Sequence, residues 1–484
     1  MYYREKLFID GLWSTSKSGN AIDVFSPHSQ QVIGKVLLAA PADVDRAVLA
    51  ARAAFDRGPW PRMQPAERIV AISRLAELYK EHRTEMAELI SAELGAPISF
   101  AKRAQVGIPL MMFSAFGDLA ATYEWQEARP GLYGNDIRIM KQPVGVVAAV
   151  VPWNMPQFLT MCKALPALLA GCCVVLKPAP ESVLDAQLLA DLVQRADLPP
   201  GVFNVVPGDR DVGEALVSHP GVDKVSFTGS TAAGRKVAMA CAEGLKQVSL
   251  ELGGKSAAIV LDDADPALVA PAIQSASLAN SGQVCNALSR ILVPASRHDE
   301  FVDALAAGME AMSVGNPADA ATQLGPLVAQ RQQVRVRGYI EEGTREGARL
   351  VVGGTELPDG LEAGWYVRPT LFSNANNDMR IAREEIFGPV LTVIPYDDED
   401  DAVRIANDSD YGLAGAVFTP DLDRGFAIAG RVRSGTFGVN QGYIMDPVAP
   451  FGGVKQSGYG RELGREGLES YLVSQSVSTA ASVK

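Results

Sequence analysis

Residues 146–151, with the sequence VVAAVV, begin a series of short apolar segments that decides the fold. Four similar segments follow: CCVVL (172–176), FNVV (203–206), KVSF (224–227) and QVSLEL (247–252). Each has the length of a buried strand, and the segments 183–196, 211–218 and 230–241 between them are long enough for helices. This alternation predicts a parallel, doubly wound sheet whose ligands bind beyond the carboxyl ends of the strands.

The flanking sequence predicts further units. Residues 41–95 carry apolar side chains at helical spacing and predict packed helices. A second α/β domain is predicted from residue 256, after the two glycines of LGGKS. Its expected strands lie near AAIVL (257–261), RILV (290–293), PVLTVI (389–394) and GAVF (415–418), and its expected helices cover 298–312 and 327–346. Residues 123–141 predict strand and turn, and we expect them to pair with ESYLVSQSV (469–477) in a protruding element suited to a subunit contact.

Composition excludes several classes of function. The 484 residues carry a net charge of −12, which argues against a nucleic-acid partner, because phosphate binding depends on clustered Lys and Arg. We expect no membrane partner, since no stretch approaches about 20 uninterrupted apolar residues. The first residues, MYYREKLFIDG, lack the apolar core of a secretory signal, and the five cysteines form no C-x-x-C, so we expect a cytoplasmic protein. The four histidines lie far apart, and we expect no metal site.

A glycine motif at one predicted turn offers an anion site. In FTGS (227–230), followed by Gly234, a glycine and a hydroxyl stand where a strand gives way to a helix. Free N–H groups and the helix dipole attract phosphate at such a turn, although a glycine turn with a serine cap accounts for the motif equally well. No G-x-G-x-x-G is present, so the standard dinucleotide fingerprint is absent.

Several motifs taken together resemble the aldehyde dehydrogenase superfamily, in its hydrolytic, NAD(P)-dependent form. They lie in the family's order and spacing over nearly the whole chain: VPWN (151–154), LKPA (176–179), FTGST (227–231), LELGGKS (250–256), SGQVC (281–285), EEIFGP (384–389), GVNQG (438–442) and PFGG (450–453). The resemblance implies an α/β fold with a Rossmann-type cofactor domain (1–122 and 143–252), a catalytic domain (253–456) and a small β oligomerisation element (123–142 and 457–484). It also implies a homo-oligomer, either a dimer or a tetramer.

The resemblance implies three catalytic residues. Cys285 matches the family nucleophile, and a thiolate suits attack on an aldehyde because it can later leave from a thioester. Asn154 matches the amide that donates to the resulting oxyanion, and Glu251 matches the base that activates water. Taken alone, Cys285 would more often be a core residue, Asn154 a turn residue and Glu251 an outward strand residue. The surrounding motifs favour the catalytic interpretation, in which an aldehyde becomes a carboxylic acid through a Cys285 thiohemiacetal and thioester.

The resemblance implies a cofactor site around Lys177, which matches a ligand of the adenosine ribose, Ser230, which matches a pyrophosphate contact, and Glu385, which matches a ligand of the nicotinamide ribose. The expected set is completed by Val151, Pro152, Trp153, Gly229, Leu252 and Phe387. Many NAD-preferring members have a Glu three residues after the lysine, and this chain has Pro180 followed by Glu181. We expect NAD, with NADP left open, because a missing carboxylate removes repulsion against a 2′-phosphate.

The residues that match the family's substrate channel are apolar and flexible. They are Met112, Met155, Met445 and Phe451, with Met111 and Phe116 on the far side, and Cys162 stands where a Trp is common. Methionines adapt to irregular shapes, so we expect a medium or bulky apolar aldehyde. A substrate carboxylate would need an arginine, for which the sequence leaves Arg290 and Arg461 open, and with them a semialdehyde dehydrogenase.

Other functions remain as alternatives. A CoA-acylating aldehyde dehydrogenase often lacks the Glu of LELGG, which this chain has. An esterase-like cysteine enzyme would need a His partner, and none lies near Cys285 in sequence. A silent protein that kept only the fold would not need Cys285, Glu251 and Asn154 together.

Overall fold

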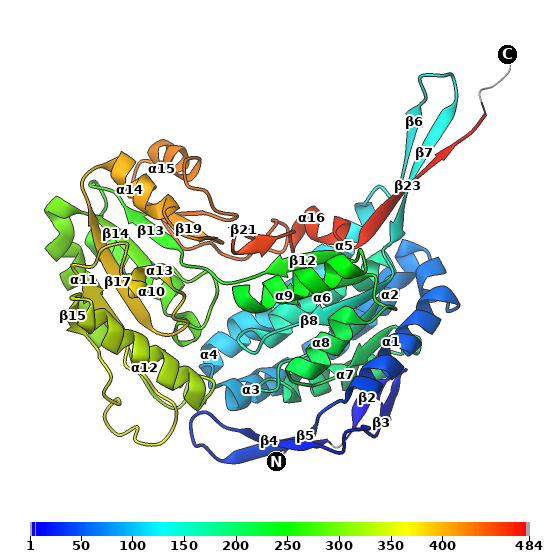
Figure 1. The fold of residues 1–484 in the computed structure, drawn as a ribbon, viewed down its shortest axis with the longest axis horizontal. Coiled ribbons are helices and arrows are strands. Elements are labelled where there is room, and N and C mark those ends of the chain that lie inside the picture. The colour runs from blue at the N-terminus through cyan, green and yellow to red at the C-terminus, as the bar shows by residue number, and fades with distance from the viewer. Residues whose placement is uncertain (1, 5, 481–484) are drawn as a thin grey trace.

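The computed structural model describes residues 2–4 and 6–480. Residues 1, 5 and 481–484, which the predicted division assigns to the first domain and to the oligomerisation element, lie outside the described residues. Figure 1 shows two lobes side by side, one formed mainly by residues before 252 and the other by residues 253–456. A narrow β element leaves the first lobe at the end that carries β23.

The first lobe is built on an eight-stranded sheet in the order β22-β12-β11-β8-β9-β10-β2-β3. Its five central strands are parallel and match the five predicted strands: β8 (Val146–Val150), β9 (Cys173–Lys177), β10 (Phe203–Val205), β11 (Lys224–Thr228) and β12 (Gln247–Glu251). The edge strands are antiparallel: β2 (Leu7–Ile9), β3 (Leu12–Ser14) and β22 (Gly458–Tyr459). Because the chain order reverses between β8 and β11, the ends of these two strands form a topological switch point, where ligands bind in such sheets.

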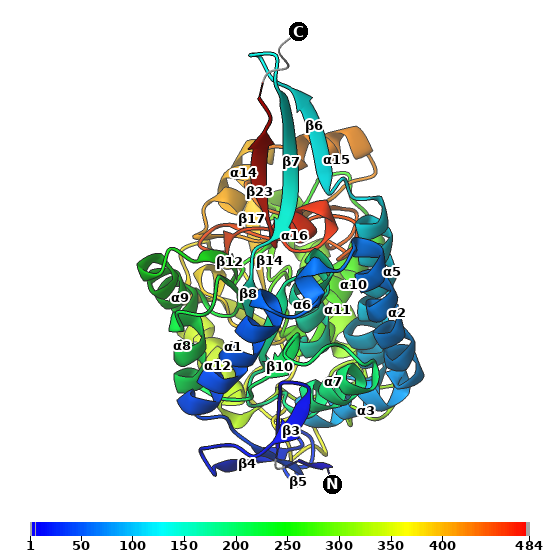
Figure 2. The ribbon, with the colours of Figure 1, turned by 90° about the vertical axis from the view of Figure 1, so that its right-hand side faces the viewer.

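Helices cover both faces of this sheet, which explains why every residue of β8, β9 and β11 is buried. Figure 2 shows α1, α8 and α9 on one side and α2, α5 and α7 on the other. The three predicted crossovers are α7 (Leu184–Arg195), α8 (Arg210–Ser218) and α9 (Thr231–Glu243). The helices predicted over residues 41–95 are α1 (Pro41–Asp56), α2 (Pro65–Glu81) and α3 (Arg83–Leu94). Helix α6 (Pro156–Ala170) is buried along its whole length and ends at Gly171, whose φ of +98° favours glycine.

One long helical segment contains a turn of unusual geometry. It runs from α4 (Ile98–Phe100) through the π-helix η2 (Ala101–Gly107) into α5 (Ile108–Thr122). Pro109 has no N–H to continue the regular ladder just beyond the π-helix. Residues 98–122 are long and apolar enough to cross a membrane, with a mean hydropathy of 1.3, but α5 packs against α2 and α6 as a core helix does.

The second lobe contains a seven-stranded sheet in the order β15-β16-β17-β14-β13-β19-β20, parallel except for β15. The four predicted strands are present as β13 (Ala257–Val260), β14 (Arg290–Pro294), β17 (Val390–Tyr396) and β19 (Gly415–Phe418). The two predicted helices are α11 (His298–Glu310) and α12 (Gln330–Arg345). The sequence did not predict β15 (Arg349–Val352), β16 (Thr370–Ser373), β20 (Gly438–Val439), α10 (Pro266–Ser277), α13 (Arg380–Arg383), α14 (Glu399–Asn407) or α15 (Leu422–Ala429).

The predicted pairing of the two distant β segments is confirmed. Strand β7 (Asp136–Pro143) lies between β6 (Gln126–Pro130) and β23 (Leu472–Ser478), with Leu472 opposite Pro143 and Ser478 opposite Ile137. Within 457–484, however, β22 joins the first sheet and α16 (Gly464–Glu469) packs against α6. We therefore propose that the oligomerisation element is better limited to residues 126–143 and 472–480.

Two small sheets complete the described residues. The N-terminal sheet consists of β1 (Tyr2–Arg4), β4 (Ala21–Phe25) and β5 (Val32–Leu37), and Figure 2 shows it at the end of the molecule opposite to β6 and β7. The other joins β18 (Tyr411–Gly412) of the second lobe to β21 (Val454–Lys455), which comes just before β22. The chain thus returns from the second lobe to the first beside the site described next.

Candidate active site

The candidate site lies where the carboxyl ends of β8, β9, β11 and β12 meet a loop of the second lobe. The Val151 N–H donates to the Lys177 carbonyl at 3.1 Å, and the Gly229 N–H donates to the Glu251 carbonyl at 3.0 Å. These two bonds join neighbouring strand ends within the first lobe. From the second lobe, the loop between η3 (Ala279–Gly282) and β14 brings Cys285 against Gly254.

The nucleophile loop has a constrained backbone. Asn280, Ser281 and Gly282 follow one another with φ of +51°, +56° and +75°. A side chain on Gly282 would strike the backbone at Gly388, and one on Gly254 would strike the Cys285 carbonyl. Left-handed residues in succession cost free energy, so packing on both sides has to hold this loop in its conformation. The loop leaves Cys285 half-buried, whereas Cys162, Cys172, Cys173 and Cys241 are all buried.

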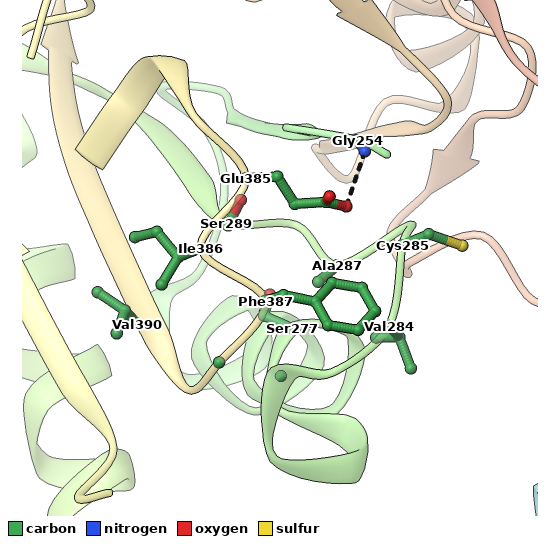
Figure 3. A pocket seen from close by; sticks show the side chains of 12 residues that line it. Gly254, Ser277, Val284, Cys285, Ala287, Ser289, Glu385, Ile386, Phe387 and Val390 are labelled. Atoms are coloured by element: carbon green, nitrogen blue, oxygen red, sulfur yellow. Dashed lines mark hydrogen bonds between the residues drawn. The ribbon is translucent and has the colours of Figure 1, made fainter. Parts of the chain in front are cut away.

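The Cys285 thiol is protonated at neutral pH in this structure. Burial, followed by the negative charges of Glu385 and Glu251, raises its pKa to about 12. The thiolate is the reactive form of cysteine, so the thiol must lose its proton for nucleophilic attack. Figure 3 shows the Cys285 side chain pointing away from Glu385, whose carboxylate accepts a hydrogen bond of 3.0 Å from the Gly254 N–H.

Glu251 ends β12 as a buried acid. Among the described residues, neither of its carboxyl oxygens has a hydrogen-bond partner. Burial, followed by the negative charge of Glu462, raises its pKa well above the ordinary value. Lys163 forms an ion pair with Glu462 and donates to Thr228 Oγ1 at 2.7 Å, and its positive charge opposes the rise in the Glu251 pKa. A buried carboxyl group with a raised pKa suits proton transfer near neutral pH.

Asn154 connects the two lobes. Its side-chain Nδ2 donates to the Gln283 carbonyl at 3.0 Å, two residues before Cys285. Its own carbonyl accepts from Asn280 Nδ2 at 3.0 Å and from Gln105 Nε2 at 2.8 Å. An amide nitrogen carries two N–H donors, so one remains for a substrate oxygen.

The residues assigned to a dinucleotide fit that assignment. Lys177 is buried at the end of β9, and its Nζ donates to the Pro178 carbonyl at 3.0 Å, which leaves donors for ribose hydroxyls. Burial lowers the pKa of Lys177 to about 8. Ser230 caps α9, where its Oγ accepts from the Ala233 N–H at 3.3 Å, and a side chain on Gly229 would strike the Phe227 ring. Leu252 packs against Gly234, which brings α9 close to the sheet.

The aromatic pair assigned to the nicotinamide ring is assembled from both lobes. The rings of Trp153 and Phe387 lie edge to face, with centroids 5.4 Å apart. Phe387 has a φ of +64°. Gln332 Nε2, on α12, donates a hydrogen bond of 2.7 Å to the Phe387 carbonyl. Phe387, Cys285 and Glu385 line one pocket together with Gly254 and Val284 (Figure 3). Burial raises the pKa of Glu385 to about 7.

Apolar side chains assigned to the substrate are grouped in the core of the first lobe. Met112, Met155 and Phe451 are buried in it, and Met445 and Cys285 pack against it from the edge. Tyr443, which the sequence did not single out, stacks on Phe451 with centroids 6.2 Å apart. We expected Met111 to line the far side of the substrate channel, but 54% of its surface is exposed.

The two arginines that the sequence left as candidates for binding a substrate carboxylate both donate hydrogen bonds to backbone carbonyls. Arg290 is buried and donates to the carbonyls of Lys255, Ile405 and Ala406. Arg461 donates to the carbonyls of Gly453 and Gly460. Arg290 is therefore engaged inside the protein. Arg461 uses a single nitrogen for both of its bonds, and its positive charge opposes the rise in the Glu251 pKa.

Sequence reasoning missed several polar residues of the site. Asn280 and Gln283 adjoin or belong to the SGQVC motif, so their amides beside a nucleophile were a usable signal. Lys163, Glu462 and Gln105 lie far from the motifs in sequence, and the chain gives no local signal for them. Among the described residues, no group of three or more His, Cys, Asp or Glu is arranged to hold a metal.

Comparison with known proteins agrees with this geometry. The family model described as "Aldehyde dehydrogenase family" matches residues 13–477. The chain belongs to the aldehyde dehydrogenase family. This aldehyde dehydrogenase is 46% identical over 473 residues to geranial dehydrogenase from Castellaniella defragrans, covering 98% of each chain.

Solved structures of the family match the whole fold. An aldehyde dehydrogenase from Mycobacterium tuberculosis, solved with NAD+, has a TM-score of 0.98 and 46% identity, covering 100% of this chain and 99% of that one. A cysteine-to-alanine variant of aldehyde dehydrogenase C from Pseudomonas syringae, solved with NAD+ and octanal, has a TM-score of 0.95 and 44% identity, covering 98% and 96% of the two chains. The predicted α/β fold of this family is thereby confirmed.

The raised pKa of Cys285 predicts how alkylation of the thiol depends on pH. Between pH 7 and 10, the rate constant for iodoacetamide should rise about tenfold per pH unit, because the thiolate fraction rises in that proportion below the pKa. Glu385→Gln should increase the rate at pH 8 about threefold or more, because it removes a neighbouring negative charge. Mass spectrometry of quenched samples measures both rates.

Glu384→Gln is the matched control, because Glu384 is ion-paired with Arg380 and its charge does not contribute to the Cys285 shift. It should leave the rate unchanged. A rate that stays flat from pH 7 to 9 would mean that the thiolate already exists in the resting protein, and would contradict this account.

Proposed function

We propose that this protein is an NAD-dependent aldehyde dehydrogenase that oxidises medium or bulky apolar aldehydes to carboxylic acids. One observation carries the proposal: the side-chain amide of Asn154 donates to the carbonyl of Gln283, two residues before the half-buried Cys285. A nucleophile and an oxyanion donor in this arrangement suit addition to a carbonyl group. One relative is named geranial dehydrogenase, and another was solved with octanal. These names support the proposed class of substrate.

The reaction assigns a separate step to each residue. Cys285 Sγ loses its proton to solvent and adds to the aldehyde carbon, and the second N–H of Asn154 Nδ2 and the Cys285 backbone N–H stabilise the resulting oxyanion. Lys177, Ser230 and Glu385 would hold NAD near Trp153 and Phe387, and the bound cofactor would supply the hydride acceptor. The thiohemiacetal on Cys285 then becomes a thioester, and Glu251 removes a proton from the water that releases the acid.

The pKa values of Cys285 and Glu251 bear on two of these steps. Burial raises the pKa of the Cys285 thiol to about 12 and also raises the pKa of Glu251. Glu251 acts as a base only in its ionised form. Lys163 carries the positive charge that favours this ionisation, and it remains fixed by Thr228 and Glu462.

A substrate panel tests the proposed function. With NAD, kcat/KM for octanal should exceed that for succinate semialdehyde by about tenfold or more, because the channel residues are apolar and Arg290 is engaged with backbone carbonyls. The measurement is the formation of NADH at 340 nm. A clear preference for succinate semialdehyde would overturn the substrate class, and no NADH with any aldehyde would overturn the function.

Two variants separate the steps. Cys285→Ala should abolish turnover while NAD still binds, as fluorescence titration would measure. Glu251→Gln should slow deacylation, so that intact mass spectrometry shows one acyl group added to the chain. Product formation that depends on added CoA would instead favour the acylating alternative.

Cofactor preference rests on the surroundings of Lys177. Pro180 offers no carboxylate, and Glu181 forms an ion pair with Arg331 of α12, across the two lobes. We infer that this pair keeps Arg331 from a 2′-phosphate and so favours NAD. Glu181 is also the charge that most raises the pKa of Lys177.

Glu181→Gln should raise the ratio of kcat/KM for NADP to that for NAD about three- to tenfold, because Arg331 is then free to meet the added phosphate. Glu181→Gln combined with Arg331→Gln should cancel the gain. Glu342→Gln, which removes a carboxylate paired with Arg345 on the same helix, is the control and should change nothing. A ratio within twofold of the original in Glu181→Gln would contradict the inference.

We also infer a homo-oligomer, as a dimer or tetramer. Strands β6, β7 and β23 extend from the body with exposed backbone edges, and Leu132 and Tyr133 at the tip are almost fully exposed. Light scattering after size-exclusion chromatography should give a multiple of 51.4 kDa. A single-chain mass at micromolar concentration would contradict this inference.

A cytoplasmic location is proposed from the cysteines. All five are free, and four of them are buried. Finding the protein outside the cytoplasm after cell fractionation would contradict this proposal.

A further inference from the structure

Three side-chain amides at the active site form a closed ring of hydrogen bonds. Asn154 Nδ2 donates to the Gln283 carbonyl at 3.0 Å, Gln283 Nε2 donates to the Asn280 carbonyl at 3.1 Å, and Asn280 Nδ2 donates to the Asn154 carbonyl at 3.0 Å. All three residues are buried. The ring fixes the oxyanion donor of the first lobe to the nucleophile loop of the second.

A fourth amide reaches this ring from a distant helix. Gln105 Nε2 donates to the Asn154 carbonyl at 2.8 Å, so that carbonyl accepts two hydrogen bonds. Gln105 is fully buried, with no exposed surface. It belongs to the π-helix η2, and π-helical turns occur frequently at functional sites.

The stability of the fold does not by itself favour a glutamine at position 105. Among the described residues, its side-chain oxygen Oε1 is buried and has no hydrogen-bond partner. Leaving a buried acceptor unsatisfied destabilises the folded state, whereas an apolar side chain of the same shape would avoid that cost. Asn154 would still keep the bond from Asn280 without Gln105. The bond from Gln105 to Asn154 therefore needs a reason other than stability.

We propose that Gln105 is a positioning residue, which orients Asn154 so that its free N–H points at the aldehyde oxygen bound to Cys285. This inference rests on the proposed function. The carbonyl of Asn154 lies one bond from the Cα that carries the donating side chain. Two donors on that carbonyl, from Gln105 and from Asn280, approach from different elements and restrict rotation of the peptide as well as its position. A misplacement of about 1 Å at a catalytic group can cost a hundredfold in rate.

Gln105→Met is the most informative variant, because methionine keeps the length and volume of the side chain and removes both polar atoms. Variants of Asn280 are less suitable, since its φ of +51° is tolerated better by asparagine than by most residues. Gln187→Met is the matched control. Gln187 is also a buried glutamine on a helix of the first lobe, and among the described residues its Nε2 has no partner.

Three measurements separate a positioning role from a structural one. In Gln105→Met, kcat/KM for octanal should fall about tenfold or more, and the loss should be in kcat rather than in KM for NAD. The rate of Cys285 alkylation by iodoacetamide should stay within twofold, because displacement of iodide forms no oxyanion. The Tm should stay the same or rise, because an unsatisfied acceptor is removed. Gln187→Met should change none of the catalytic quantities.

The inference is overturned if Gln105→Met keeps kcat/KM within twofold of the original protein. It is also overturned if alkylation, Tm and kcat/KM all fall together, because that pattern reports a collapsed core. If the original protein itself forms no NADH from any aldehyde, the proposed function fails before this test begins, so the two failures are distinguishable.

Discussion

The arrangement of this site depends on hydrogen bonds between the two lobes. Cys285 is carried by a loop of the second lobe, whereas Glu251 ends strand β12 of the first sheet and Asn154 lies in the loop that follows β8. The ring formed by Asn154, Gln283 and Asn280 is buried, so each of its amides bonds in a medium of low dielectric constant, where an unpaired partner would be costly. These bonds offset part of the cost of the successive left-handed residues in the loop.

Burial also shifts the pKa values of two groups at the site. It raises the pKa of the Cys285 thiol and of the Glu251 carboxyl. The raised pKa favours the less reactive, protonated form of the thiol. Lys163 lies in the same buried region and, with Glu462 and Thr228, supplies a fixed charge against which Glu251 can ionise.

The fold was largely predictable because buried parallel strands require runs of apolar residues, which can be recognised in the sequence. The five central strands of the eight-stranded first sheet and four of the seven strands of the second matched such runs. Strand β15 has two exposed residues and lies at an edge, and β20 has only two residues, so neither gives an apolar run. The helices α14 and α15 are short and have mixed polarity, and their positions follow from packing on a sheet that was only partly predicted.

The site was predictable to the extent that its residues lie in local motifs. Cys285, Asn154 and Glu251 were assigned through the resemblance to the family, because each lies in one of the matching motifs. Gln105 was not found, because a buried glutamine in a helical segment 49 residues from Asn154 resembles any other helical residue. Lys163 was missed for a similar reason, since its charge is matched by Glu462, which lies 299 residues away.

The central claim is that the amide ring holds an oxyanion donor within reach of a carbon bound to Cys285. A crystal structure of Cys285→Ala with NAD and octanal tests it most directly, because the aldehyde is then retained without reacting. The account predicts the aldehyde oxygen within hydrogen-bonding distance of both Asn154 Nδ2 and the backbone N–H of residue 285, with the three ring bonds intact. An aldehyde oxygen turned toward Glu251, or a ring opened by the bound substrate, would contradict it.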